Sequence, residues 1–290
     1  MILKKISQFI PHFFLPYFRL IKNIFIDLKS KNLYQIKFNK SNENLIVLGN
    51  GPSLDKDLEK IKILTKSSDF FCVNNFACSD LYQKFKPNKY LFLDDYFFSN
   101  EAHDDWVLKR NETFKNINNK TNWKIQIFIP SHANIKIFRN QINNPYIQFI
   151  KFNTTGITNK SLKINFMYFN TGLFGPYQGN VLIYAIYFGI WSKYKNIKIF
   201  GADLSLQENI SVDQKTNHLF MNFKHFGNKN IREKFLKNPE KIHPFKMHEF
   251  LNLSAETFHA HYVLSKYAKS KKINITNNSN YSLIDSYSRT

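Results

Sequence analysis

A short apolar run that ends at once in a glycine-rich turn constrains the fold of this chain more than any other feature. Residues 45–48 read Leu-Ile-Val-Leu, the composition of a strand buried on both faces. Residues 49–53 read Gly-Asn-Gly-Pro-Ser, and apolar positions then recur at helical spacing, namely Leu54, Leu58, Ile61 and Leu64. Such a corner binds phosphate in many α/β folds, because backbone N–H groups and the helix dipole point at the anion. The segment therefore predicts a nucleotide or nucleotide-sugar site.

Further apolar runs alternate with helical segments along the rest of the chain. The runs cover residues 69–75, 89–95, 123–129, 196–203 and 271–276. Residues 181–191 predict one helix, and residues 255–269 predict another with Ser254 as its N-cap. This alternation predicts a Rossmann-like α/β fold, with a mostly parallel sheet and helices on both faces. Residues 99–122 and 204–254 are polar and irregular, and long enough to be lid or acceptor-binding segments.

Polar side chains recur where the expected strands stop. They are Asn50, Ser53, Asn74, Asn75, Asp94, Asp95 and Asp203. In open α/β sheets the ligand binds beyond the carboxyl ends of the strands. We therefore expect these side chains to converge on one cleft, although they are far apart in the sequence.

The charge balance points to anionic partners. Lys and Arg number 41 against 21 Asp and Glu, a formal net charge of +20, which attracts nucleic acid, anionic lipid or acidic glycolipid. The basic residues are mostly Lys spread along the chain and no nucleic-acid-binding motif is present, so we expect no nucleic-acid partner.

Cys72 and Cys78 have no second pair and form no zinc signature. We expect them to be small core residues in a reducing compartment.

Residues 1–44 form a basic and aromatic N-terminal arm. Its apolar side chains are interrupted by basic ones, and Pro11 and Pro16 break any single long helix. A membrane-spanning helix needs an apolar run of about 20 residues, and the arm contains none. Aromatic rings at the headgroup boundary and lysines on anionic phosphates favour peripheral membrane contact. The alternative is that the arm packs on the domain formed by residues 45–290.

The order of these motifs resembles the bacterial sialyltransferases of glycosyltransferase family 42. The motifs are GNGPS, VNNF and LDD after successive strands, a glycine-bearing helix, and FGAD after a later strand. They are scattered over residues 45–285. The resemblance implies a Rossmann-like domain of the GT-A-variant type with a lid over about 204–254. It also implies inverting, metal-independent transfer of sialic acid from a CMP donor, with no other cofactor.

The resemblance implies donor-binding roles for individual residues. The loop Asn50, Gly51, Pro52 and Ser53 matches the family's loop beside the CMP phosphate, and Asn74 matches an amide that contacts the donor. Asp94 stands where the family usually has another asparagine. Thr171 and Gly172, or else Gly179 and Asn180, fall near its Thr-Ser-Gly turn. Gly201 and Asp203 match its Gly-x-Asp near the cytidine, and residues 280–284 are similar to its Asn-Ser-Leu near the last strand.

The chain departs from the family after Gly-x-Asp. The family has two tyrosines there that help the phosphate leave, whereas residues 204–211 contain none. This departure leaves the donor open between CMP-sialic acid, another CMP-nonulosonate, CMP-Kdo and a different nucleotide-sugar.

Glycosyl transfer also needs a base for the acceptor hydroxyl, and a histidine suits that role near neutral pH. Of the nine histidines, His225 best matches the family's His-aromatic-Gly surroundings, and His248 is the second candidate.

The adjacent carboxylates Asp94 and Asp95 would point to opposite faces of an extended strand, which disfavours a metal site.

The expected protein is thus a glycosyltransferase at the inner face of the bacterial cytoplasmic membrane, either monomeric or a homo-oligomer. Its expected acceptor is a surface glycolipid or polysaccharide such as lipooligosaccharide. One alternative is a nucleotide-dependent phosphotransferase such as a diphosphokinase, although the chain has no P-loop. The other is a non-catalytic scaffold for anionic glycan or lipid, which leaves the strand-end polar residues unexplained.

Overall fold

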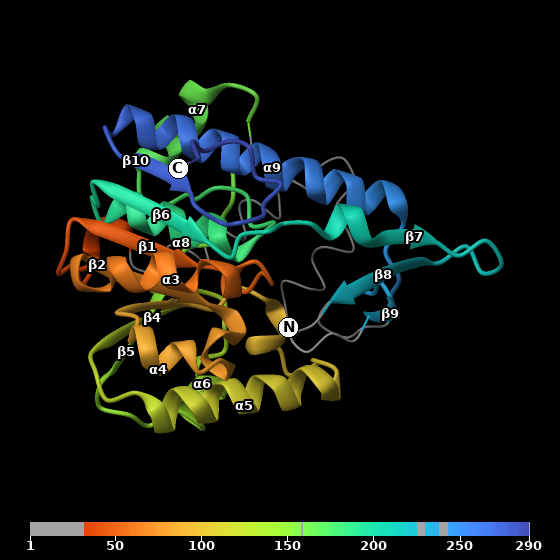
Figure 1. Cartoon of the computed structure of the whole chain (residues 1–290), viewed down its shortest axis with the longest axis horizontal. Coiled ribbons are helices and arrows are strands. Elements are labelled where there is room, and N and C mark those ends of the chain that lie inside the picture. Colours follow the sequence, from red (N-terminus) through yellow and green to blue (C-terminus); the bar gives the residue numbers. More distant parts are fainter. Residues whose placement is uncertain (1–31, 158, 225–229, 238–242, 290) are drawn as a thin grey trace, which may run out of the picture.

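The computed structural model describes residues 32–157, 159–224, 230–237 and 243–289, and its centre is a seven-stranded sheet (Figure 1). The strands are β1 (Asn44–Leu48), β2 (Ser68–Val73), β3 (Lys89–Leu91), β4 (Ile125–Pro130), β5 (Ile147–Phe152), β6 (Asn196–Phe200) and β10 (Asn274–Asn277). Their order is β10-β6-β1-β2-β3-β4-β5, and all neighbours are parallel. The chain reverses direction across the sheet between β1 and β6, so the ligand-binding crevice of such folds falls beyond their carboxyl ends.

Helices cover both faces of this sheet, which confirms the predicted fold class. One face carries α7 (Leu162–Asn170), α8 (Val181–Trp191) and α9 (Met247–Ser270); the other carries α3 (Leu54–Leu64), α4 (Leu81–Phe85), α5 (Asp104–Lys120) and α6 (Ile135–Arg139). A hydrophobic core lies on each face of the sheet, one against α8 (the α8 core) and one against α3 (the α3 core). Successive strand side chains alternate between these two cores, because neighbouring residues of a strand point to opposite faces. In β1, Leu45 and Val47 face the α8 core, whereas Ile46 and Leu48 face the α3 core.

A small antiparallel sheet lies beyond the carboxyl ends of the large one (Figure 1). It follows the short helix η5 (Leu206–Asn209) and comprises β7 (Ile210–Val212), β8 (Leu219–Lys224) and β9 (Asn230–Lys234). The segment predicted as an irregular lid therefore has regular structure, and its last residues belong to α9. Ser254 is buried inside α9 and is not its N-cap, so that prediction is wrong. Helix α9 begins earlier because the Glu249 carboxylate accepts the Lys246 N–H at 2.9 Å.

Residues 99–122 are also not irregular, because most of them form α5. Its buried positions Thr113, Phe114 and Ile117 recur at helical spacing within a mostly polar segment. The Arg110 guanidinium donates to the carbonyls of Tyr96 and Ser99 at 3.0 and 2.9 Å. These bonds hold α5 against η4 (Asp95–Phe97), beside the ends of the central strands.

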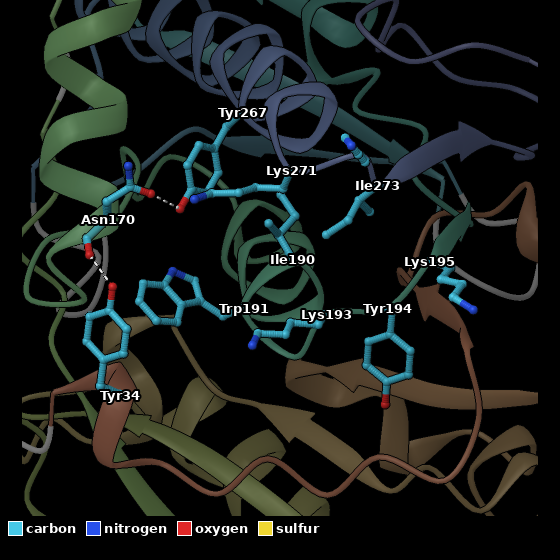
Figure 2. A pocket seen from close by; sticks show the side chains of 11 residues that line it. Tyr34, Asn170, Ile190, Trp191, Lys193, Tyr194, Lys195, Tyr267, Lys271 and Ile273 are labelled. Atoms are coloured by element: carbon cyan, nitrogen blue, oxygen red, sulfur yellow. Dashed lines mark hydrogen bonds between the residues drawn. The ribbon is translucent and has the colours of Figure 1, made fainter.

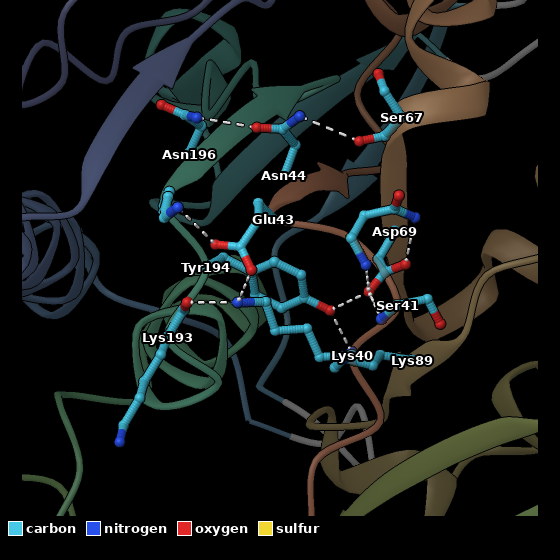
Figure 3. Close-up of polar contacts among 12 residues, drawn as sticks. Lys40, Ser41, Glu43, Asn44, Ser67, Asp69, Lys89, Lys193, Tyr194 and Asn196 are labelled. Atoms are coloured by element: carbon cyan, nitrogen blue, oxygen red, sulfur yellow. Dashed lines mark hydrogen bonds and ion pairs between the residues drawn. The ribbon is translucent and has the colours of Figure 1, made fainter.

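Residues 32–44, assigned by sequence to the arm, pack on the α/β domain. Leu33 and Ile36 belong to the α8 core. Figure 3 shows the next segment held at the amino ends of the strands, where the Asp69 carboxylate accepts the Ser41 N–H at 2.8 Å and the Tyr194 hydroxyl at 2.6 Å. The rest of the arm lies outside the described residues, so its membrane contact stays a prediction. Among the described helices, none is long and apolar enough to cross a membrane.

Candidate functional site

The glycine turn after β1 packs directly against the end of β6. The Gly49 N–H donates to the Phe200 carbonyl and the Gly51 N–H to the Gly201 carbonyl, both at 2.9 Å. A Cβ added at Gly51 would lie 2.3 Å from Asp203 Oδ1, so only glycine fits there. Gly201 has a φ of +63°, in the left-handed region that glycine adopts without strain. Two segments 150 residues apart thus form one corner.

The Asp203 carboxylate lies at the N-terminus of α3. In a phosphate-binding corner, the backbone N–H groups at this position would donate to the phosphate. Its Oδ2 accepts the Ser53 N–H at 3.1 Å, and its Oδ1 accepts the Ser53 hydroxyl. Burial and the nearby Asp57 charge raise the pKa of Asp203, although the bonds from Ser53 oppose the shift. In this arrangement Ser53 and Asp203 fix the shape of the turn. Asn50 and Pro52 are its exposed residues.

The ends of β2 and β3 are joined to this corner by side-chain amides. The Asn50 Nδ2 donates to the Val73 carbonyl at 3.2 Å, which links β1 to β2. The Asn74 Nδ2 donates to Asp94 Oδ2 at 2.8 Å, and the Asn74 Oδ1 accepts the Leu93 N–H at 3.3 Å, which links β2 to β3. The predicted convergence of Asn50, Asn74 and Asp94 is therefore found.

Two non-glycine residues beside this site hold left-handed backbone. Asn74 has a φ of +46° and Leu204, directly after Asp203, a φ of +47°. Asparagine tolerates this region, whereas a leucine there is strained. Such strain clusters at ligand sites, where the surrounding structure holds it in place.

Asp94 is a half-buried carboxyl group with a shifted pKa. Burial, reinforced by the Asp95 charge, raises its pKa to about 6, while the Asn74 bond and the Lys109 charge act in the opposite direction. Asp95 is exposed and begins the short helix η4, so the two carboxylates do not continue a strand as the sequence predicts. Among the residues that the structure describes, no three His, Cys, Asp or Glu side chains are grouped so that they could hold a metal ion. Metal independence stays a prediction.

The two sequence alternatives for the glycine-bearing turn lie at opposite ends of α8. Asn180 Oδ1 accepts the Leu182 N–H at 2.7 Å and caps the helix; the Leu182 side chain reaches within 3.3 Å of a Cβ added at Gly49. Residues 179–180 therefore lie near the site. Thr171 and Gly172 lie at the other end of α8, away from the site. A Cβ added at Gly172 would lie 3.2 Å from the side chain of Trp191, the last residue of that helix.

The C-terminal loop adds a tyrosine that the sequence did not indicate. The Leu283 N–H donates to the Asp203 carbonyl at 2.9 Å and the Ser279 hydroxyl accepts the Ala202 N–H at 3.0 Å, which holds the loop over the end of β6. The exposed Tyr281 hydroxyl donates to the Glu208 carboxylate, within the segment where tyrosines are absent from the sequence. No local pattern links these residues, which are 73 positions apart.

The two candidate bases have different outcomes. His225 lies outside the described residues. His248 is exposed in the first turn of α9, beside the Glu249 carboxylate whose pKa its charge helps to lower. The role of His248 as a base stays a prediction.

No protein-family model and no curated protein matches this chain. Among solved structures it is similar to the MAf glycosyltransferase from Magnetospirillum magneticum AMB-1, with 10% identity and a TM-score of 0.49. The match covers 92% of this chain, which spans 37% of the length of that one. A likeness of this size is too low to indicate an activity.

The candidate site is thus defined by the chain's own geometry. Asn50, Asn74, Asp94 and Asp203 line consecutive carboxyl ends of β1, β2, β3 and β6, joined by the bonds described above. It combines exposed and half-buried hydrogen-bonding groups with a carboxyl that titrates near neutrality. This chemistry suits a polar ligand such as a nucleotide or sugar.

Proposed function

We propose that this chain is a glycosyltransferase that binds a nucleotide-sugar at the carboxyl ends of β1, β2, β3 and β6. The observation that carries the proposal is the continuous row of strand-end polar groups at the reversal point of a parallel sheet. Ligands of open α/β sheets bind at such points. The small sheet β7–β9 lies off the same edge (Figure 1), and in this proposal it covers the bound donor.

The finer proposal concerns the donor and acceptor. The motif resemblance favours CMP-sialic acid or another CMP-nonulosonate, transferred with inversion and without a metal to a surface glycolipid or polysaccharide. Asn50 and Asn74 would hydrogen-bond the donor, while Ser53 and Asp203 would keep the turn in shape. A neutral Asp94 carboxyl would donate a hydrogen bond to a phosphate or ribose oxygen, whereas its ionised form would repel a phosphate.

A thermal-shift screen with CMP, UDP, GDP, ADP and ATP tests this proposal. A ligand at 100 times its Kd stabilises the native state by about 2.7 kcal/mol. We expect CMP to raise the Tm more than the other nucleotides, and EDTA to leave that shift unchanged. A shift with ATP that requires magnesium would instead indicate a phosphotransferase, and no shift with any nucleotide would favour the non-catalytic scaffold.

The catalytic base is proposed to be His225, with His248 as the second candidate. General-base catalysis contributes at least about 100-fold to the rate, so removal of the base should cost that much turnover. We expect His225→Ala to lose CMP release from CMP-sialic acid in the presence of acceptor, while the CMP-induced thermal shift is retained. The matched variant His248→Ala should turn over normally; the reverse result would transfer the role to His248.

A further inference from the structure

A cavity of about 470 Å³ opens at the end of the sheet opposite to the proposed donor site (Figure 2). It lies between the C-terminal ends of α8 and α9, next to the starts of β6 and β10. Aromatic rings of Tyr34, Trp191 and Tyr267 form one part of its wall. The Tyr34 and Tyr267 hydroxyls donate to the backbone carbonyl and side-chain oxygen of Asn170 at 2.7 and 3.0 Å, which fixes both rings.

The rest of the lining carries four lysines, Lys193, Lys195, Lys271 and Lys272. Lys195 pairs with the exposed Glu43 at 3.5 Å. Across the described part of the chain, no carboxylate forms an ion pair with the other three. Within the described residues, three of the four lysines therefore have no carboxylate partner, and the negative ends of two helix dipoles offset their charge only in part.

Backbone geometry also singles out two of these lysines. Lys193 and Lys272 follow the ends of α8 and α9 with φ values of +55° and +58°. Glycine or asparagine is favoured at a left-handed position after a helix, since a longer side chain is strained there. Both helices nevertheless end in a lysine that lines the same cavity. Strained residues cluster at functional sites, so the pairing of two of them around one cavity, rather than the strain of either alone, supports a binding site.

Exposed apolar side chains belong to the segments that supply part of the cavity lining. Tyr34 is 69% exposed, and Met167 and Ile164 are exposed on α7, which ends at Asn170 of the lining. The Asn32 side chain donates to the carbonyl of Thr171, which follows the lining residue Asn170, at 3.0 Å, so residue 32 lies near the cavity. Residues 1–31 hold six basic side chains against one acidic one. Apolar groups next to clustered lysines are typical of a surface that meets anionic lipid.

We propose that this cavity binds the phosphate of an anionic phospholipid headgroup. Lys193, Lys271 and Lys272 supply the charge, and the tyrosine and tryptophan rings contact the glycerol and the first acyl carbons. The site is separate from the proposed donor site, because it lies at the amino ends of the strands. It would bring the face that carries the arm against the membrane.

Co-sedimentation of the full chain with vesicles tests the proposal. The double variant Lys193→Gly with Lys272→Gly removes two charges and also suits the left-handed backbone, so it should fold. Each lysine at an anionic surface contributes about 1 kcal/mol, so binding to vesicles of phosphatidylcholine with phosphatidylglycerol should weaken roughly 30-fold. Wild-type protein should bind vesicles of pure phosphatidylcholine much more weakly.

A matched control removes the same charge outside the cavity. Lys86 also has positive φ (+44°) and is exposed, and Lys115 is exposed on α5. Lys86→Gly with Lys115→Gln should bind the anionic vesicles nearly as wild type does. An equal loss in both double variants would overturn the proposal in favour of unspecific charge attraction. A thermal shift by glycerol phosphate that Lys193→Gly with Lys272→Gly abolishes, without any difference in vesicle binding, would overturn it in favour of a soluble phosphate ligand.

Discussion

Replacement of Gly51 by alanine is expected to abolish nucleotide binding. The added Cβ would lie 2.3 Å from Asp203 Oδ1 and 2.7 Å from the Gly201 carbonyl oxygen, and the latter is backbone that cannot rotate away. The turn must therefore separate from β6, which breaks the bond from the Gly51 N–H to Gly201 and moves Asn50 from its place above β2. We expect the CMP-induced rise in Tm to disappear. The Tm without ligand should also fall, because the hydrogen bonds from Ser53 to the buried Asp203 carboxylate are disturbed.

A comparison with Gly189→Ala separates this effect from general loss of stability. A Cβ at Gly189 would meet the Leu45 Cδ2 and Ile197 Cδ1 atoms at 2.8 and 2.9 Å, deep in the α8 core. Overpacking of this kind costs about 1–3 kcal/mol, although these methyl groups can shift. Gly189→Ala should lower the Tm and keep the CMP-induced rise. If Gly51→Ala kept the same rise, the glycine turn would not be part of the donor site.

The alternating fold could be predicted because its central elements have simple patterns. Helix α8 is apolar along its whole length, and its predicted range of residues 181–191 agrees with the structure. The strand ends were recognisable because Gly-Asn-Gly, Asn-Asn, Asp-Asp and Gly-Ala-Asp each follow an apolar run. Parallel strands bring such ends to one edge, so Asn50, Asn74, Asp94 and Asp203 could be grouped without knowledge of the strand order.

The features that the sequence did not reveal depend on contacts between distant segments. Helix α5 is mostly polar, and it is held by buried Phe114 and by Arg110, whose partners belong to other elements. The Asp203 carboxylate accepts hydrogen bonds from Ser53 at the start of α3, a placement set by how β6 pairs with β1. Tyr281 reaches Glu208 through a loop that follows the last strand. None of these contacts has a local sequence signal.

Replacement of Asp94 by asparagine is expected to stabilise the protein above neutral pH. The carboxyl has a pKa of about 6 in the fold against an ordinary value of 3.8, so between these pH values the folded chain binds more protons than the unfolded one. Its stabilising contribution is complete below pH 4 and is lost as the pH rises through 6. At pH 8 the ionised group costs up to about 3 kcal/mol, at 1.36 kcal/mol per pKa unit. Asparagine removes this cost and can still accept the Asn74 bond.

Urea unfolding of Asp94→Asn and wild type at pH 5 and pH 8 measures this difference. The variant should be more stable by up to about 3 kcal/mol at pH 8 and by roughly half as much at pH 5. Glu112→Gln, on an exposed carboxylate of α5, should change stability by less than about 0.5 kcal/mol at both pH values. Equal stability of wild type and Asp94→Asn at pH 8 would show that Asp94 ionises without cost. A confirmed cost would mean that this chain keeps a destabilising carboxyl among its strand-end amides, as expected of a group that takes part in donor binding.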